Sequence, residues 1–264
     1  MGTFALKMAH REDIVLNTLQ KKKKLKTREV AEILNVSECT VRRFFEELEK
    51  RGEAVRVYGG IKLAGSKQGE YHFENLQLRQ SEQKQRIGDY ASTLVKSGDI
   101  LYLDSGTTIQ QMALALARRF EKNDLEDVQI FTNSLQNLTI LSEYCDINLI
   151  GGHFRGKRKD FCGYLTEMVL EAVSFGKCFL GADGVGINSG DGIMATDVFT
   201  AKINQIVSKR SEEMYLLLDS TKFVRRSLIR YAALEDAQMI ITDNGLAEEM
   251  RNLLITHAKK VMFV

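Results

Sequence analysis

The chain has 264 residues and a formal net charge of +2, which is long enough for two domains with buried cores. It holds no apolar run of about 18 residues and no cleavable signal stretch, so we expect a cytoplasmic protein with no membrane partner. Its four cysteines form no Cys-x-x-Cys pair and its four histidines are scattered, which argues against a metal site.

Positive charge is concentrated near the beginning of the chain. Residues 1–65 carry 14 of the 37 Lys and Arg residues but only 9 of the 35 Asp and Glu residues, a net charge of +5. The rest of the chain has a net charge of −3. A small basic module joined to a slightly acidic body is typical of a protein that binds the nucleic-acid backbone at one end.

The first predicted helix spans residues 10–20 and would pack through Ile14, Val15 and Leu19. Four consecutive lysines, residues 21–24, follow it. Such a run is either the solvated end of a helix or a contact to DNA phosphates, and the sequence leaves both interpretations open.

Residues 27–60 predict two short amphipathic helices joined by a tight turn and followed by a basic hairpin. The first helix ends at Asn35, and Ser37 is placed to cap the second by accepting a backbone N–H. Helical spacing puts Val41, Phe45 and Leu48 on one buried face of the second helix. The residues assigned to the packed face of the first helix are Val30, Ala31, Ile33 and Leu34.

The second helix has one packed face and an outer face that carries arginine, an arrangement that fits the major groove of DNA. One such helix spans too few base pairs for useful specificity. We therefore expect a homodimer or tetramer on double-stranded operator DNA. The candidate DNA-contacting residues of the helix and the hairpin are Ser37, Cys39, Thr40, Arg42, Arg43, Arg56 and Tyr58.

A change of composition separates this module from the rest of the chain. Small and polar residues at 64–71 are typical of a linker, and a helix with apolar residues on one side follows them. The domains expected on this basis are a winged helix-turn-helix domain at 1–65, a linker with a connecting helix at 66–97, and an α/β sensor domain at 98–264.

From residue 98 onward, apolar strands alternate with helical segments, which predicts an α/β fold with a mostly parallel sheet and helices on both faces. Ligands of such sheets bind in the loops at the carboxyl ends of the strands. The predicted strands are Ile100–Leu103, Val128–Phe131, Ile147–Ile150, Cys178–Leu180, Met214–Leu218, Met239–Ile241 and Val261–Val264. The predicted helices are Ile109–Arg119, Gly163–Val173 and Val198–Lys209.

Four of the predicted strand ends carry polar residues. At the first, hydroxyl side chains and a glycine precede a helix, whose free N–H groups and dipole suit a phosphate. Each loop alone is more typical of a helix cap or a turn, but four at successive strand ends of one sheet indicate a ligand site. The candidate ligand residues in these loops are Asp104, Ser105, Gly106, Thr107, Thr108, Thr132, Asn133, Ser134, Gly181, Asp183 and Lys222.

Residues 153–161 form a strongly basic loop in the same part of the chain. We expect a solvated surface turn, and the alternative is a lid that closes over an anionic ligand. The cationic residues of this loop are Arg155, Lys157, Arg158 and Lys159.

The first domain contains the motifs SECTVRR and VRVYGG, and the second contains DSGTT, TNS, GADG and DSTKF. Through these motifs, the chain resembles the DeoR-type family of bacterial sugar-operon repressors over roughly residues 10–245. The family also carries a Gly-Gly pair after the third predicted strand, here Gly151 and Gly152. This chain departs from the family at Phe44, where the family usually has Asp, at Tyr58, where it has His, and at Thr200, where it has Glu.

The resemblance implies a sensor fold similar to sugar-phosphate isomerases and a phosphorylated sugar as effector. It would assign Gly106, Thr107 and Thr108 to the phosphate, with Lys222 nearby. The same resemblance would give Asp104, Asn133 and Asp183 to the sugar, and Thr196 and Asp197 remain candidates near the departure at position 200.

We therefore expect a ligand-responsive transcription repressor of a carbohydrate operon, with no catalytic residues, no metal and no cofactor. The alternative is a sugar-phosphate isomerase-type enzyme that carries a DNA-binding segment. Against it, the four loops hold no histidine, and Thr200 replaces the usual glutamate. A third interpretation is a repressor whose sensor responds to a partner protein instead of a sugar.

Overall fold

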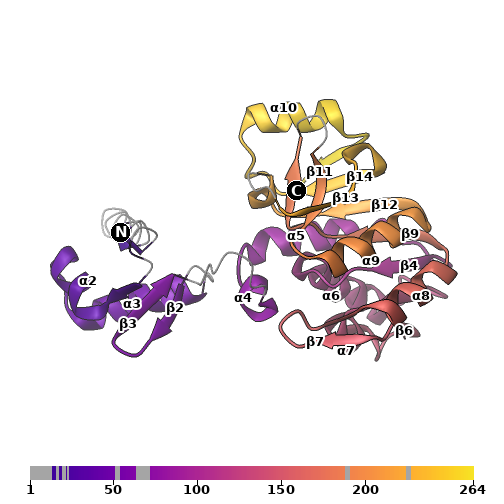
Figure 1. Cartoon of the computed structure of the whole chain (residues 1–264). Helices are drawn as coiled ribbons and strands as arrows, with labels where there is room; N and C mark the ends of the chain where they lie inside the picture. Colours follow the sequence, from indigo (N-terminus) through magenta and orange to yellow (C-terminus); the bar gives the residue numbers. More distant parts are fainter. Residues whose placement is uncertain are drawn as a thin grey trace. The chain divides into compact units, whose positions relative to one another are not determined.

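The computed structural model describes residues 14–15, 18–19, 22, 24–50, 54–63, 72–187, 191–223 and 227–264. The chain divides into two compact units, Met1–Gln80 and Ser81–Val264. Figure 1 shows the elements of each unit. Among the described residues, no helix combines the length and the apolar character that crossing a membrane requires.

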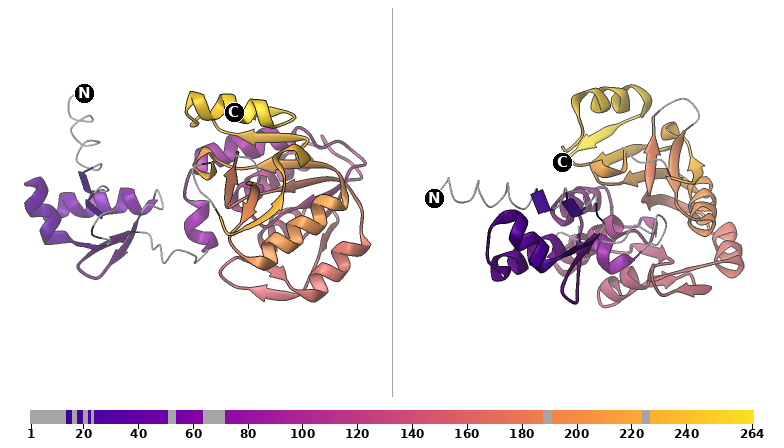
Figure 2. Two further views of the ribbon diagram at one scale, coloured as in Figure 1. Left: turned by 45° about the horizontal axis from the view of Figure 1, so that its top comes forward. Right: turned by 60° about the vertical axis from the view of Figure 1, so that its left-hand side comes forward.

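The first unit is a winged helix-turn-helix. Two helices pack on a three-stranded antiparallel sheet whose order is β1-β3-β2 (Figure 2). Its elements are β1 (Lys24–Lys26), α2 (Thr27–Leu34), α3 (Glu38–Lys50), β2 (Ala54–Val57), β3 (Gly60–Leu63) and a short helix, α4 (Phe73–Gln77). This architecture confirms the two helices and the hairpin that the sequence predicted.

The turn between the helices forms as its sequence predicts. Asn35 ends α2 in the left-handed conformation, with φ of 49°, which Asn tolerates better than most residues. Ser37 then caps α3, because its Oγ accepts the backbone N–H of Thr40 at 3.3 Å. The two polar residues thus fix where one helix ends and the next begins.

The core of this unit contains the predicted stripe of α3 together with Phe44, which is fully buried. Phe44 therefore extends the core and does not present an apolar surface to DNA. Ile33 was assigned to the packed face of α2, but that assignment is wrong, since 49% of the residue is exposed. Val15 and Leu19 of the predicted first helix join the same core.

Other predictions for this unit lie partly outside the described residues. They include most of the helix at 10–20, two lysines of the run at 21–24, and the linker at 64–71. Of the lysine run, Lys22 pairs with Glu29, and Lys24 belongs to β1, which the sequence analysis did not predict.

The second unit begins with α5 (Ser81–Ser92), which the sequence analysis grouped with the linker. Ile87 and Ala91 of this helix are buried in the core of the second unit. A Cβ atom at Gly88 would come within 2.5 Å of the backbone nitrogen of Met112, so glycine is what allows α5 to approach α6 (Thr107–Glu121) closely. The helix is therefore an integral layer of the second unit.

A seven-stranded sheet forms the centre of the second unit, and all its strand pairs are parallel. Its order is β15-β14-β12-β9-β4-β5-β6, which confirms the predicted α/β class and all seven predicted strands. The strands are β4 (Ile100–Leu103), β5 (Gln129–Thr132), β6 (Ile147–Leu149), β9 (Phe175–Leu180), β12 (Ser211–Leu217), β14 (Met239–Thr242) and β15 (Val261–Phe263).

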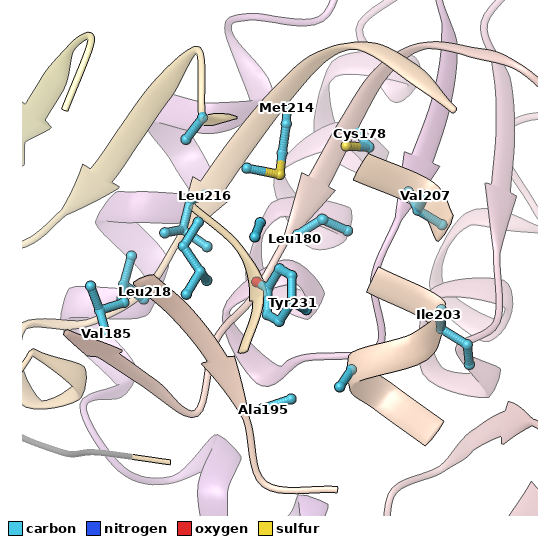
Figure 3. Packing of buried hydrophobic residues seen from close by; sticks show 14 of the residues in the cluster. Cys178, Leu180, Val185, Ala195, Ile203, Val207, Met214, Leu216, Leu218 and Tyr231 are labelled. Atoms are coloured by element: carbon cyan, nitrogen blue, oxygen red, sulfur yellow. The ribbon is translucent and has the colours of Figure 1, made fainter. Parts of the chain in front are cut away.

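Helices cover both faces of this sheet (Figures 1 and 2). Because successive strand residues point to opposite faces, Leu101 and Leu103 pack with α5 and α6, whereas Tyr102 packs on the other side. Figure 3 shows that second layer, where Leu180 and its neighbours lie opposite Ile203 of α9. The remaining helices are α7 (Leu135–Leu141), α8 (Tyr164–Ala172), α9 (Val198–Lys209) and α10 (Glu248–His257).

The sequence analysis missed the short strands that lie outside the main sheet. They form a two-stranded hairpin, β7-β8, and a three-stranded antiparallel sheet, β10-β11-β13. Each strand has only three or four residues, too few for a recognisable alternation of apolar and polar positions. They are β7 (His153–Arg155), β8 (Asp160–Cys162), β10 (Gly184–Gly186), β11 (Gly192–Ala195) and β13 (Ile229–Ala232).

Candidate functional site

The outer face of α3 presents the side chains proposed for DNA recognition. Cys39, Arg42 and Arg43 are exposed. Arg42 lies 4.0 Å from Glu38 one turn earlier, a solvated pair that contributes little to stability. Thr40 is less available, because its hydroxyl lies 3.0 Å from the Oγ of Ser37 at the helix cap. Arg42 and Arg43 are therefore both accessible to solvent on α3.

Arg56 in the wing has a structural role in this structure. Its Nε donates to Glu49 at 2.7 Å and its Nη1 to Glu46 at 2.9 Å, so it ties β2 to α3. The hydrogen bond to Glu49 is the main reason that the pKa of Arg56 is raised. Tyr58 stands fully exposed at the tip of the hairpin, where Gly59 adopts a φ of +76°. Of the two wing candidates, Tyr58 is thus the one that projects outward.

In the second unit, the carboxyl ends of β9, β4 and β5 lie side by side, since these strands are neighbours in the sheet. Asp104 at the end of β4 is buried, and its Oδ2 accepts the backbone N–H of Gly181, which follows β9, at 3.0 Å. Its Oδ1 accepts the N–H of Ser105 at 2.7 Å. Burial raises the pKa of Asp104 against the effect of these two hydrogen bonds. Asp104 thereby joins two of the predicted ligand loops.

The helix that starts beyond Asp104 offers an anion site. Gly106 occupies the N-cap position of α6 and supplies no side-chain acceptor, while Thr107 and Thr108 are largely buried in the first turn. The first N–H groups of a helix have no partner within the helix and lie at the positive end of its dipole. This end of α6 is therefore suited to a phosphate.

The residues after β5 mainly hold the loop itself. Thr132 donates from Oγ1 to the carbonyl of Leu103 at 2.7 Å, and Ser134 caps α7 by accepting the N–H of Asn137 at 3.2 Å. Asn133 accepts from the hydroxyl of Tyr102 at 2.9 Å and donates to a carbonyl of β8 at 2.8 Å. All three predicted ligand residues thus make structural hydrogen bonds beside the α6 terminus.

The glycine pair after β6 allows the backbone to pass close to α8. Gly152 has a φ of +153°, and a Cβ atom there would lie 2.2 Å from the Oγ1 of Thr166. Thr166 of α8 also donates to the carbonyl of Gly151 at 2.8 Å. The pair lies at the open end of the β7-β8 hairpin, away from its turn at residues 156–159.

That turn is where the structure departs most from the sequence analysis. Arg155 and Arg158 do not form a solvated surface turn, because their side chains are only 15% and 12% exposed. Both guanidinium groups contact Asp160, at the start of β8, and Asp197, at the start of α9. Lys157, between them, is exposed, as the prediction required.

Arg155 neutralises the buried carboxylate of Asp160. Its Nε donates to Oδ1 at 2.8 Å and its Nη2 to Oδ2 at 2.6 Å, a two-point contact with a carboxylate that has no exposed surface. Asp160 also accepts the hydroxyl of Ser105 at 2.9 Å. The hairpin is therefore bound to the loop that precedes α6.

The same arginine binds the start of α9. Arg155 Nη1 donates to Asp197 at 2.8 Å and Nη2 donates to the hydroxyl of Thr200 at 3.1 Å. Asp197 is the N-cap of α9 and accepts the N–H of Thr200 at 3.0 Å. Burial opposes ionisation of Asp197, but Arg158, this N–H and Arg155 outweigh it and lower its pKa. The hydroxyl of Thr200 thus contacts both Arg155 and Asp197.

Arg158 makes longer contacts with three carboxylates. Its Nη1 lies 3.1 Å from Asp197, its Nε 3.7 Å from Asp160, and its Nη2 4.0 Å from Asp183. Asp183 also accepts the backbone N–H of Thr196 at 2.8 Å. The hairpin turn, the loop after β9 and the beginning of α9 meet at this side chain.

Lys222 lies at the end of η1 (Ser220–Lys222), after β12, which is separated from β4 by β9. Neighbouring strands are about 4.8 Å apart, so the β12 end is about 10 Å from the β4 end. In η1, Ser220 donates to Asp243 at 2.9 Å. Lys222 thus shares this edge of the sheet with the other candidates.

The sequence analysis missed the ion-pair cluster of Arg155, Arg158, Asp160, Asp183 and Asp197 as a unit. The only available signal was a basic run that ends in an aspartate, since Asp197 lies 42 positions after Arg155. Within the described residues, no group of three or more His, Cys, Asp or Glu side chains is arranged to hold a metal ion.

Comparison with known proteins gives matches to both units. Residues 11–67 match the family model of the DeoR-like helix-turn-helix domain, and residues 79–244 match that of the DeoR C-terminal sensor domain. The HTH-type transcriptional regulator IolR of Bacillus subtilis is 30% identical over 223 residues, which cover 84% of this chain and 85% of that protein.

A lactose phosphotransferase system repressor of Lactococcus lactis is 33% identical over 226 residues, which cover 84% of this chain and 86% of that repressor. Among solved structures, a D-ribose-5-phosphate isomerase in complex with phospho-erythronic acid aligns with a TM-score of 0.41 and 16% identity, over 55% of this chain and 54% of the isomerase.

The contact between Arg155 and Asp160 leads to a testable prediction about stability. Arg155→Ala leaves the buried carboxylate without its two-point partner, so we expect the free energy of unfolding to fall by about 3–5 kcal/mol in urea denaturation. Lys157→Ala, which removes an exposed charge from the same turn, should change it by less than about 0.5 kcal/mol. Equal effects of the two substitutions would contradict this role of Arg155.

Proposed function

The chain belongs to the DeoR family of transcription regulators, and from that premise we propose that it represses a carbohydrate-utilisation operon. A phosphorylated sugar, bound at the strand ends of the second unit, controls its affinity for the operator. The observation that supports this proposal most is the presence of both parts in one chain: an arginine-bearing recognition helix and a buried polar site beside a helix N-terminus.

DNA recognition is proposed to divide between two kinds of contact. Lysines and arginines of the first unit supply affinity through the phosphate backbone, and this contribution weakens with salt. Arg43, exposed on α3, supplies discrimination through a base edge, with Arg42 and Cys39 beside it. Arg56 contributes by holding the wing against α3 through Glu46 and Glu49.

The effector site is proposed to lie between the α6 terminus and the β7-β8 hairpin turn. Phosphate binds at Gly106, Thr107 and Thr108, and the sugar hydroxyls bind the carboxylates that surround the site. The chain needs no cofactor and no metal for this role. A coupling of about 1–3 kcal/mol between effector and DNA changes operator affinity about 5–150-fold, which is enough for a genetic switch.

We propose no catalytic activity. Isomerisation needs a base at the reacting carbon, and the nearest carboxylates are committed to other groups. Asp104 accepts two backbone N–H groups and Asp160 binds Arg155. The relatives compared above carry the names of transcription regulators. Turnover of any phosphorylated aldose or ketose by the purified protein would reverse this assignment.

The role of Arg43 is tested by its replacement. Arg43→Ala should cost about 1–3 kcal/mol of affinity for the operator and much less for random duplex, because a two-point guanine contact is lost. Gel-shift titration at one fixed salt concentration measures both. Arg118→Ala, which removes an exposed arginine from α6, is the charge-matched control. An equal loss on both DNAs would assign Arg43 to the phosphate backbone.

The effector is tested by thermal unfolding of the full chain with a panel of phosphorylated aldoses and ketoses. A ligand at 100 times its Kd should stabilise the protein by about 2.7 kcal/mol. The same compound should change operator affinity in a gel shift, while its unphosphorylated sugar should do neither. If no member of the panel has an effect, the sensor responds to something else, and a partner protein becomes the leading alternative.

Self-association is the third element of the proposal, because one recognition helix spans too few base pairs. Apolar side chains of α8 are available for it, since Tyr164, Leu165 and Met168 are exposed in the single chain. Light scattering at micromolar concentration should give the mass of a dimer or tetramer. A monomer that binds the operator with full specificity would contradict this part.

A further inference from the structure

We propose that Arg158 binds the phosphate of the effector, and that it does so by exchanging its contacts with Asp183 and Asp197 for the phosphate oxygens. This inference rests on the function proposed above and adds to it the cation that neutralises the ligand. It also gives Asp183 and Asp197 a second role, as the carboxylates that hold Arg158 while the site is empty.

The two buried arginines differ in the geometry of their contacts with the aspartates. Arg155 makes four hydrogen bonds of 2.6 to 3.1 Å to Asp160, Asp197 and Thr200. Two of them bind one buried carboxylate in the two-point geometry, which is the strongest arrangement available to a guanidinium. If Arg155 turned to a ligand, the buried carboxylate of Asp160 would lose its two-point partner. Arg155 is therefore a positioning residue.

The ion pairs that Arg158 makes with the aspartates are longer, at 3.1, 3.7 and 4.0 Å to three different residues. None of these three contacts has the two-point geometry that Arg155 makes. A phosphate offers closer, charge-assisted hydrogen bonds to the same guanidinium and can accept two at once. Exchange of the Asp183 and Asp197 contacts for phosphate is therefore favourable for Arg158, whereas the corresponding exchange is not favourable for Arg155.

The position of Arg158 places it beside the proposed phosphate site. Asp160 contacts the Nε of Arg158 and also accepts the hydroxyl of Ser105, the residue before the N-cap of α6. The charge of Arg158 is also close enough to Asp104 to oppose the rise in the pKa of that carboxyl. Arg158 is thus linked through Asp160 to Ser105, which immediately precedes the N-cap residue of α6. Lys222 follows β12, which is separated from β4 by β9 in the sheet.

The charges of the cluster favour such an exchange. The carboxylates of Asp160, Asp183 and Asp197 already contact the two guanidinium groups, and the buried Asp104 lies nearby. An incoming phosphate therefore competes with these carboxylates for the positive charge of Arg158. Once Arg158 turns to the phosphate, Asp183 and Asp197 are left to accept hydroxyl groups of the sugar. The inferred ligand therefore carries a phosphate and neighbouring hydroxyls, which fits a sugar phosphate better than inorganic phosphate.

The first test removes the charge of Arg158 in the full-length protein. Arg158→Gln should weaken binding of inorganic phosphate and of the phosphorylated sugars at least tenfold in titration calorimetry, because a charge-assisted contact is lost. Arg158→Lys should restore part of the affinity, as a point charge without the two-point geometry. Lys157→Gln, an exposed residue of the same turn, is the matched control and should bind like the wild type.

The second test uses the competing carboxylate. Asp183→Asn keeps an oxygen for the N–H of Thr196 but removes a charge that holds Arg158. Inorganic phosphate should then bind several-fold more tightly than to the wild type. In this variant, a sugar phosphate should no longer bind more tightly than inorganic phosphate. A merely structural role of Arg158 predicts neither of these opposite changes.

The outcomes separate this inference from the proposed function. If a sugar phosphate binds the wild type and Arg158→Gln equally well, the effector stands and Arg158 is not its phosphate ligand. If Asp183→Asn weakens inorganic phosphate binding, the exchange is wrong. If neither inorganic phosphate nor any phosphorylated sugar binds the wild type, the effector part of the proposed function fails together with the inference.

Discussion

The carboxylate of Asp160 has no exposed surface, and a buried charge of this kind must be neutralised by a partner in good geometry. Arg155 supplies that partner, and the remaining donors of Arg155 bind Asp197 and Thr200 at the beginning of α9. The hydroxyl of Ser105 completes the arrangement from the loop before α6. One buried ion pair thus fixes three segments that are far apart in the sequence, and the geometry of the proposed effector site depends on it.

Around this fixed pair, the parallel sheet brings the rest of the site together. The order β9-β4-β5 aligns three strand ends, and Asp104 bonds the first two of them through the N–H of Gly181. The α6 terminus provides N–H donors, while the hairpin turn provides Arg158. In the first unit, the buried Phe44 packs α3 into the core, and Arg42 and Arg43 are exposed on its outer face. In both units, the polar groups of the proposed sites are therefore held by well-packed elements.

Local patterns predicted most of this architecture, because each element carries its own signal. The spacing of Val41, Phe45 and Leu48 predicted α3, and continuous apolar runs predicted the seven parallel strands. The ion-pair cluster could not be predicted, since Arg155 and Asp197 belong to different elements that meet only in the folded chain. A basic run in a sequence does not reveal whether its arginines face solvent or buried carboxylates. For the same reason, the hydrogen bonds that the amide of Asn133 makes with Tyr102 and β8 could not be predicted from the sequence.

A crystal structure of the full-length protein with a phosphorylated sugar that raises its melting temperature tests the proposed phosphate site most directly. We predict the phosphate at the N-terminus of α6, with the guanidinium of Arg158 hydrogen-bonded to it and turned away from Asp183 and Asp197. Arg155 should keep its two-point contact with Asp160. A phosphate bound at Lys222, with Arg158 still paired to its three aspartates, would contradict the account.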